Sequence, residues 1–433
     1  AGKNTTTDGS VMLAHNEDDS GEQMINIYNV PSDTQKGTNK YIWVEFPGMS
    51  VADGFLNEYG VAVASDACNS REDREDFTDG GVLYQVRVNV AKYAKSARHA
   101  VEIIGKLVRE KGYKGSGRTY VIADCKEGWV CSVVKGRHWI AQRVADDMVM
   151  CIPNYYTIGE IDLSDTTNFM GSEDIITYAQ DRGWYNPQKD GKFIFKKVYS
   201  NPGTYSAYRN AIRHISAMNY ITGESYGLNP DTYSFMVKPN RKLGLPDMIQ
   251  ILSSHGENIP DNLMKERKTD SHNECICNDR TVCAAIFQLR DYLPVEIGAV
   301  MWATAASPCI EAFIPWYCGM SKSPQGFGRF ASAAEAEQKH FSDAKRMKEN
   351  YPNAIAWKFV NRLEWVLEDY PNRIVDISKM KKEYQKILFK NQEKFEKDAV
   401  KIFNGSSGRD KVKLEEKLNE YTAKCYKEYL KRF

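Results

Sequence analysis

A dense group of polar, titratable side chains stands near the start of the chain, in the run His15-Asn16-Glu17-Asp18-Asp19. It follows residues 11–14, a short apolar stretch typical of a strand, which comes after the hairpin signal Asp8-Gly9. So many charges are seldom buried together in a core, and a histidine titrates near neutral pH. The run is therefore either a solvated acidic turn, such as a Ca²⁺-type loop, or part of a reaction site.

Other patterns that carry chemistry are weak in this sequence. His255 and His272 stand near Ser253 and Ser254 without the spacing of a Ser-His-Asp triad, and neither a Gly-x-Ser-x-Gly elbow nor a phosphate-binding loop occurs. The pair Gly115-x-Gly117 lacks the strand and helix that a dinucleotide site requires. The sequence therefore offers no second catalytic signature.

The cysteines favour buried thiols over a framework of disulfides. Ten cysteines in 433 residues are too few for such a framework, and most of them stand beside apolar residues. Cys275, Cys277 and Cys283 lie close together with His272 nearby, but zinc sites usually show a second matching pair. A metal site, a disulfide and free structural thiols all stay open here, and we favour free thiols.

Composition and charge exclude some classes of function. A chain of 433 residues with 42% hydrophobic residues can form one large domain or two to three average ones. The 58 basic and 57 acidic residues nearly cancel, so we expect no nucleic-acid or anionic-membrane surface. The longest apolar stretch, residues 297–306, is too short to cross a bilayer.

The elements that must position these residues alternate between strands and helices. Strands are predicted at residues 41–44, 61–65, 119–123, 129–134, 139–141, 148–153, 280–289 and 296–306. Helices are predicted at residues 83–110, 173–183, 205–222 and 245–254. From about residue 331, Lys and Glu at helical spacing predict a helical region, interrupted by Pro352, Pro371 and residues 405–408. This pattern predicts layered α+β packing.

Six ordered segments resemble the dipeptidase family C69, a group of N-terminal-nucleophile hydrolases that includes PepD-like dipeptidases and secernins. The first is Gly2-Lys3, then Asp8-Gly9-Ser10, then Asn16-Glu17-Asp18-Asp19. The others are Asn57-Glu58-Tyr59-Gly60-Val61-Ala62; residues 122–129; Trp139-Ile140-Ala141-Gln142-Arg143-Val144 with Asp146-Asp147; Pro153-Asn154 followed by residues 168–184; and residues 293–298 with Trp302 and residues 315–319. The resemblance covers most of the chain up to about residue 350.

The resemblance implies a four-layer αββα sandwich with a C-terminal helical region. We accordingly expect residues 1–330 to form the catalytic domain, with a helical extension over residues 331–433 packed on it. In the family the nucleophile is an N-terminal cysteine about half a dozen residues before Gly2. The partner of the strand after Asp8-Gly9 would likewise lie mostly before residue 1, so the chain is expected to be cut within its opening hairpin.

The resemblance also implies roles for six residues. Asp18 would orient the α-amine beside the nucleophile, and His15 stands where the family more often has a longer cation. Asn154 would donate its amide to the oxyanion, and the backbone near Asp66 would supply a second donor. Arg209 would be a site arginine at a helix start, a role for which Arg280 competes. Glu58 would bind the substrate amine. Asp18 and Asp19 as solvated carboxylates, an Asx turn at Asn154, a surface Arg209 and a hairpin role for Glu58 are the structural alternatives.

The function implied is a cysteine-type amidohydrolase, foremost a dipeptidase that cleaves small peptides without a metal or organic cofactor. Two alternatives stay open: an N-acyl amide hydrolase acting on bile-salt conjugates or penicillin side chains, and a binding protein without a nucleophile. A small peptide is the expected partner, nucleic acid and membrane insertion are not expected, and a homo-oligomer is compatible. We expect export after removal of a signal peptide, with a cytoplasmic protein as the alternative.

Overall fold

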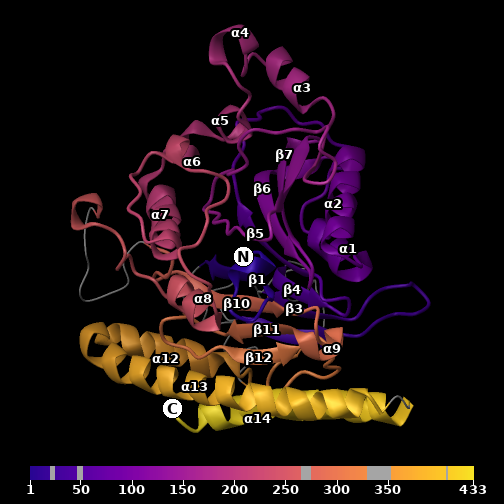
Figure 1. Cartoon of the computed structure of the whole chain (residues 1–433), viewed down its shortest axis with the longest axis vertical. Coiled ribbons are helices and arrows are strands. Elements are labelled where there is room, and N and C mark those ends of the chain that lie inside the picture. The colour runs from indigo at the N-terminus through magenta and orange to yellow at the C-terminus, as the bar shows by residue number, and fades with distance from the viewer. Residues whose placement is uncertain (20–24, 46–51, 265–274, 329–352, 406–407) are drawn as a thin grey trace. The chain divides into compact units, whose positions relative to one another are not determined.

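The chain folds into two compact units that share strand β1. A computed structural model describes residues 1–19, 25–45, 52–264, 275–328, 353–405 and 408–433 (Figure 1). Unit 1 comprises Ala1–Leu13, Val63–Gly244 and Gly256–Lys265, and unit 2 comprises Ala14–Ala62, Leu245–His255 and Glu266–Phe433. The boundary thus passes through β1 (Val11–Asp18). Each unit is described by itself.

Unit 1 is built on an antiparallel sheet. Its strands are neighbours in chain order: β5 (Ala62–Ala67), β6 (Tyr113–Ala123), β7 (Gly128–Gly136), β8 (Trp139–Val144) and β9 (Phe169–Gly171). The pairs from β6 to β9 are antiparallel, and Thr119 lies opposite Ser132 with the two hydroxyls 3.0 Å apart. Alternate β-branched and aromatic residues suit this pleated, half-buried surface.

Two helices lie along this sheet, where the sequence predicted one. They are α1 (Gln85–Tyr93) and α2 (Ala97–Lys111), seen beside β6 and β7 in Figure 1. The chain turns extended at Ala94, and the Ser96 side chain then caps α2 by accepting from the His99 amide. Gly105 permits close packing, because a Cβ there would lie 2.1 Å from the Trp139 ring.

The rest of unit 1 consists of short helices around an aromatic core. They are α3 (Ile175–Asp181), α4 (Pro187–Asp190), α5 (Phe195–Tyr199), α6 (Pro202–Tyr205) and the longer α7 (Tyr208–Thr222), with 3₁₀ turns at Lys3–Thr5, Pro230–Thr232 and Asp261–Leu263. The strand predicted at residues 148–153 is wrong. Only Val149 makes a bridge, to Val237, and the following residues form a loop.

Unit 2 contains two groups of antiparallel strands. One is β2 (Asn26–Val30), β3 (Tyr41–Glu45) and β4 (Ala52–Asn57), and the other is a four-stranded sheet in the order β1, β10 (Thr281–Leu289), β11 (Ala299–Thr304) and β12 (Ile314–Tyr317). Every residue of β10 is buried. The strand predicted at residues 296–306 begins later, because Pro294 starts the short helix α9 (Val295–Gly298). Helix α8 (Leu245–Leu252) completes this part.

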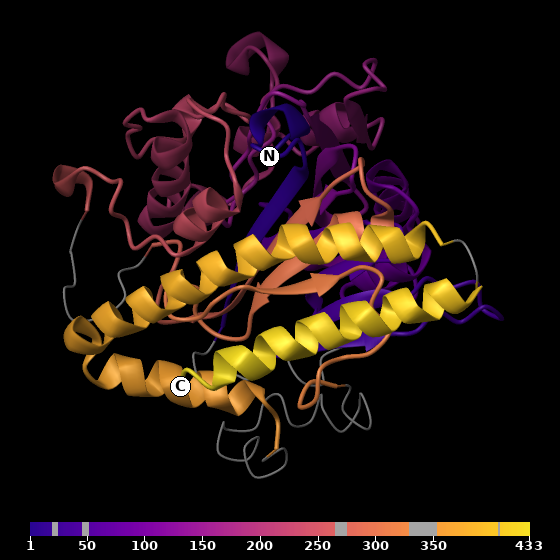
Figure 2. The ribbon, with the colours of Figure 1, turned by 60° about the horizontal axis from the view of Figure 1, so that its bottom comes forward.

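Three helices at the C-terminal end pack within unit 2. They are α12 (Ala356–Glu368), α13 (Tyr370–Phe403) and α14 (Gly408–Leu430), and Figure 2 shows α13 and α14 crossing the strands β10 to β12. Thr422 donates to the Pro315 carbonyl at 2.8 Å. A buried ion pair of 2.7 Å joins Arg290, the residue after β10, to Glu396 of α13. The predicted break at Pro371 falls at Asp369 instead, since a proline is tolerated in the first turn of a helix.

These observations confirm the α+β class, with antiparallel sheets, helices over them and a helical C-terminal region. The predicted domain boundary at residues 330 and 331 lies outside the described residues, as does Pro352. Among the helices that the structure describes, none is both long and apolar enough for a membrane span.

Candidate active site

In unit 1, helix α7 holds the side chain of Asn154 in a fixed orientation. The Arg213 guanidinium donates to Asn154 Oδ1 at 3.0 Å, and Asn154 Nδ2 donates to the Ala67 carbonyl at 3.2 Å. The arginine therefore assigns which end of the amide carries the oxygen. A primary amide has two N–H donors, and only one of them is needed for Ala67.

The backbone around Asn154 is fastened to the same helix. Asn210 Nδ2 donates to the Asn154 carbonyl at 3.4 Å and to the Thr204 carbonyl at 2.8 Å. One residue further, the Tyr155 hydroxyl lies 2.7 Å from His214 Nδ1. Burial, with Lys196 nearby, lowers the pKa of His214 to about 3, so this imidazole is neutral. These contacts fix the backbone after Pro153 and so restrict the position of the Asn154 side chain.

Asp66 and Arg209 stand on elements close to Asn154 in unit 1. Asp66 is the penultimate residue of β5. It directly precedes Ala67, whose carbonyl accepts a hydrogen bond from the Asn154 side-chain amide. Arg209 is the second residue of α7, at a helix start as expected, one turn before Arg213. Arg213 is the arginine whose hydrogen bond to the Asn154 side chain is seen in the structure. The substrate-binding roles of Asp66 and Arg209 stay predictions.

In unit 2, the Asp18 carboxylate is held by the segment that leads into β10. Asp18 Oδ1 accepts from the Thr281 hydroxyl at 2.7 Å, and Oδ2 accepts from Asn278 Nδ2 at 2.9 Å. The neighbouring Asn16 amide donates to the carbonyls of Leu252 and Ile276, at 2.8 and 3.1 Å. Both oxygens of the carboxylate are therefore fixed in direction.

The run from His15 to Asp18 is strand, where the sequence predicted a turn, because β1 continues to Asp18. Successive side chains of a strand point to opposite faces. Asn16 and Asp18 accordingly share one face, while His15 shares the other with Glu17, whose carboxylate lies 3.8 Å from His15 Nε2. The three-residue spacing of His15 and Asp18 places them on opposite faces of β1.

Glu58 stabilises the turn after β4. Its Oε1 accepts from the Lys40 backbone N–H at 2.9 Å, and its own N–H donates to the Lys40 carbonyl at 2.9 Å. Asn57 closes the turn, its side-chain oxygen accepting from the amides of Tyr59 and Val61. This is the hairpin role considered as the alternative, and recognition of a substrate amine by Glu58 stays a prediction.

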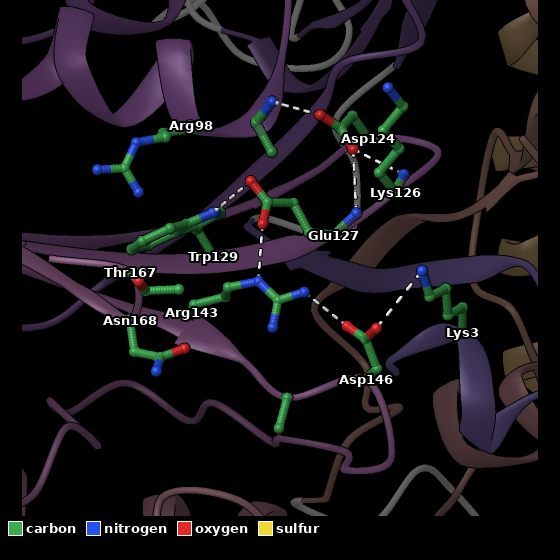
Figure 3. Close-up of polar contacts among 12 residues, drawn as sticks. Lys3, Arg98, Asp124, Lys126, Glu127, Trp129, Arg143, Asp146, Thr167 and Asn168 are labelled. Carbon is green, nitrogen blue, oxygen red and sulfur yellow. Dashed lines mark hydrogen bonds and ion pairs between the residues drawn. The ribbon is translucent and has the colours of Figure 1, made fainter. Parts of the chain in front are cut away.

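A charged network in unit 1 holds residues 2–4, the segment from which the chain enters the hairpin (Figure 3). Arg143 donates through Nε to Glu127 at 2.7 Å and through Nη2 to Asp146 at 2.6 Å, and Lys3 Nζ lies 3.4 Å from Asp146. The backbone of Gly2 donates to the Met148 carbonyl. A Cβ at Gly2 would lie 2.4 Å from the Ala145 carbonyl oxygen, so only glycine fits.

Cys68, Cys131 and Cys425 are poor nucleophiles. Burial raises the pKa of the Cys68 and Cys425 thiols to about 12 and holds the pKa of Cys131 far above its ordinary value. The thiolate is the reactive form. Of the predicted group, Cys275, Cys277 and Cys283 are buried, and Cys283 lies within β10.

The family model described as "Peptidase family C69" matches residues 80–347, more than half of the chain. The chain belongs to peptidase family C69. It is similar to "Probable dipeptidase B" of Streptococcus pyogenes serotype M1, 24% identical over 365 residues that cover 75% of this chain and 72% of that protein. It is also similar to "Dipeptidase A" of Lactobacillus helveticus, 24% identical over 362 residues that cover 75% and 76%.

Among solved structures, this C69 peptidase is similar to penicillin V acylase from Agrobacterium tumefaciens. The two chains are 11% identical with a TM-score of 0.36, over 71% of this chain and 82% of that one. Family membership, together with the antiparallel sheets and their helices, confirms the expected N-terminal-nucleophile class of fold. As a member of a peptidase family, the protein is a hydrolase that acts on peptide bonds.

Sequence reasoning missed three residues that orient the candidate groups of this C69 peptidase: Arg213, Asn278 and Thr281. Arg209 and Arg213 stand four residues apart on one helix face, so the sequence alone does not distinguish them. Asn278 and Thr281 lie more than 250 residues from Asp18, and no local pattern connects them. The one available signal was that polar residues, Asn278 and Thr281, stand at the start of the buried strand β10.

Proposed function

We propose that this C69 peptidase is a dipeptidase that cleaves small peptides with an N-terminal cysteine nucleophile. The observation that carries the proposal is the Asn154 amide, oriented by Arg213 at 3.0 Å so that its Nδ2 end faces away from the guanidinium. An amide-bond hydrolase requires fixed donors aimed at the oxygen that becomes negative. The names of the dipeptidase relatives support small peptides as the substrates.

In the proposed mechanism, the thiolate of a cysteine that precedes Gly2 attacks the carbonyl carbon of the scissile bond. The free α-amine of that cysteine, with an ordinary pKa of about 8, takes the thiol proton and passes it to the leaving amine. The resulting acyl-enzyme thioester is then hydrolysed by a water molecule, which releases the carboxylate and restores the thiol. None of these steps uses the buried cysteines such as Cys68.

Asn154 and Asp18 support different steps of this mechanism. The second N–H of the Asn154 amide is assigned to the oxyanion, together with a backbone N–H near Asp66 and Ala67. Asp18 is assigned to accept a hydrogen bond from the α-amine and so to orient its lone pair. The hydrogen bonds from Thr281 and Asn278 fix the carboxylate for this task. His15 lies beside Glu17 on the other face of β1 and has no part in this assignment.

A substrate panel on protein from the native source tests the proposal. The panel contains dipeptides with varied side chains, an N-acylated dipeptide, a penicillin and a bile-salt conjugate. Dipeptide hydrolysis that stops after thiol alkylation and that is slowed by Asn154→Ala supports the proposal. Faster hydrolysis of the N-acyl amides than of any dipeptide would overturn the dipeptidase assignment, and no hydrolysis of any member would favour a binding protein.

A further inference from the structure

Two thiols and an imidazole meet in unit 2. One ligand atom each of His255, Cys277 and Cys309 lies within 4.8 Å of the other two. The three residues come from distant positions: His255 follows α8, Cys277 precedes β10 and Cys309 follows β11. We propose that His255, Cys277 and Cys309 bind a thiophilic metal ion, Zn²⁺, that joins these three loops.

The spacing of the three groups suits a zinc ion. Zn–S and Zn–N bonds of about 2.3 and 2.0 Å place tetrahedral ligands about 3.5 to 3.8 Å apart. Ligand atoms within 4.8 Å of one another reach this spacing by a shift of about one ångström. Thiolate and imidazole are the ligands that zinc prefers over hard cations such as Mg²⁺ or Ca²⁺.

Hydroxyl groups next to the three ligand residues can hold their side chains in a metal-binding orientation. The Tyr370 hydroxyl lies 3.2 Å from His255 Nδ1, so Nε2, a buried atom, is the nitrogen that we assign to the metal. The Ser307 hydroxyl lies 3.2 Å from Cys277 Sγ and 3.6 Å from Cys309 Sγ. The fourth ligand position therefore goes to this hydroxyl or to a water molecule that it holds.

Burial and access also fit a structural metal site. Cys277 and Cys309 are buried in an apolar cluster with Leu363 and Val366, whereas His255 is only partly buried and gives the ion a route of entry. Zinc with two thiolates is neutral, so the nearby Lys381 ammonium does not oppose it. Lys381 donates to Ser253 Oγ at 3.2 Å and to the Pro308 carbonyl, next to two of the ligands.

Hydrogen bonds link the proposed metal site to β1. The Cys277 amide donates to the Ser254 carbonyl at 2.9 Å, and Asn16 bridges the carbonyls of Leu252 and Ile276. An ion between His255 and Cys277 would tighten the same two segments that Asn16 holds. The metal is therefore structural: it stabilises the segment that carries Asn278 and Thr281, and it takes no part in bond cleavage.

Metal analysis of the full chain tests the proposal directly. The protein is purified without chelators, reconstituted with Zn²⁺ and analysed for bound metal, and the apo form is titrated with Co²⁺. We expect one zinc per chain and a cobalt–thiolate charge-transfer band. Cys277→Ser and Cys309→Ser should lose both signals, whereas Cys275→Ser, a matched buried cysteine two residues away, should keep them. Tyr370→Phe should weaken zinc binding by about tenfold.

Three results would overturn the proposal. The first is wild-type protein that neither retains zinc nor shows the cobalt band. The second is a metal content unchanged in both Cys277→Ser and Cys309→Ser. The third is a Cys277–Cys309 disulfide in protein isolated without reductant. The cobalt band needs only the wild-type chain, so the proposal remains testable even where a serine variant fails to fold.

Discussion

Arg213 donates a hydrogen bond of 3.0 Å to the side-chain oxygen of Asn154, and this contact decides which end of the amide can act as a donor. Asn154 follows a loop rather than a strand, so its own backbone gives it little rigidity. The rigidity comes from α7, through Arg213, Asn210 and the contact between Tyr155 and His214. The orientation of the candidate oxyanion donor therefore depends on one helix.

Loss of the Asn154 amide should affect turnover more than substrate binding. We expect Asn154→Ala to lower kcat by about 10²- to 10³-fold, since a removed oxyanion donor acts only in the transition state. Arg213→Met should lower kcat by about 10- to 100-fold, because the amide would lose its fixed orientation. Arg209→Met is the matched variant on the same helix face. A larger fall in kcat for Arg209→Met than for Arg213→Met would contradict this account.

Asp18 should depend on the donors that hold it. We expect Asp18→Asn to lower kcat by about 10²-fold or more, as for other residues that assist proton transfer. Thr281→Val keeps the side-chain shape but removes the 2.7 Å hydrogen bond to Asp18, and about a tenfold loss is expected for one charge-assisted bond. Glu17→Gln, one residue away on the opposite face of β1, is the control. Equal falls in kcat for Glu17→Gln and Asp18→Asn would contradict a specific role of Asp18, because they would show that loss of one negative charge at either position has the same effect.

Gly2 should be required for stability. A Cβ at this position would lie 2.4 Å from the Ala145 carbonyl oxygen and 2.5 Å from that of Asp146. Forcing these atoms apart should lower the free energy of unfolding of Gly2→Ala by about 1–3 kcal/mol. Gly159→Ala, where no heavy atom lies within 4 Å of the new Cβ, should change it little. Urea denaturation of both variants checks this, and equal stabilities would contradict the close contact.

The buried His214 should make stability depend on pH. Its pKa of about 3 in the folded protein lies below the ordinary value of about 6.5, because burial and Lys196 disfavour the charged form. The stabilisation is complete above pH ~6.5 and is lost as the pH falls towards 3, where only the unfolded chain takes up the proton. His214→Gln should remove about 1.4 kcal/mol per pH unit from this slope. Parallel stability curves between pH 7 and pH 5 would contradict the assignment.

Much of the framework was predictable from sequence because local patterns encode it. The strands β6 to β8 and the helix α7 follow from their apolar periodicity. The break between α1 and α2 was missed because apolar residues continue through it, while Ser96 caps the second helix. The strand predicted at residues 148–153 failed because its apolar side chains pack against a loop-rich core without a neighbouring strand.

The contacts that orient the candidate site could not be predicted, since they join residues far apart in the chain. Asp18 accepts hydrogen bonds from Asn278 and Thr281, and Cys277 meets Cys309 and His255, which are distant in the chain. Such pairings are set by the order of strands in a sheet, here β1 beside β10 beside β11. Sequence spacing carries no information about that order.

Dipeptide hydrolysis by an N-terminal cysteine requires one particular thiol, and chemical labelling can identify it. Protein from the native source is treated with a thiol-alkylating reagent until hydrolysis stops, with and without a protecting dipeptide, and the modified cysteine is located by peptide mass mapping. We expect one protected adduct, on an N-terminal cysteine that precedes Gly2. An adduct that abolishes activity on one of the ten cysteines within residues 1–433, or activity that survives complete alkylation, would contradict it.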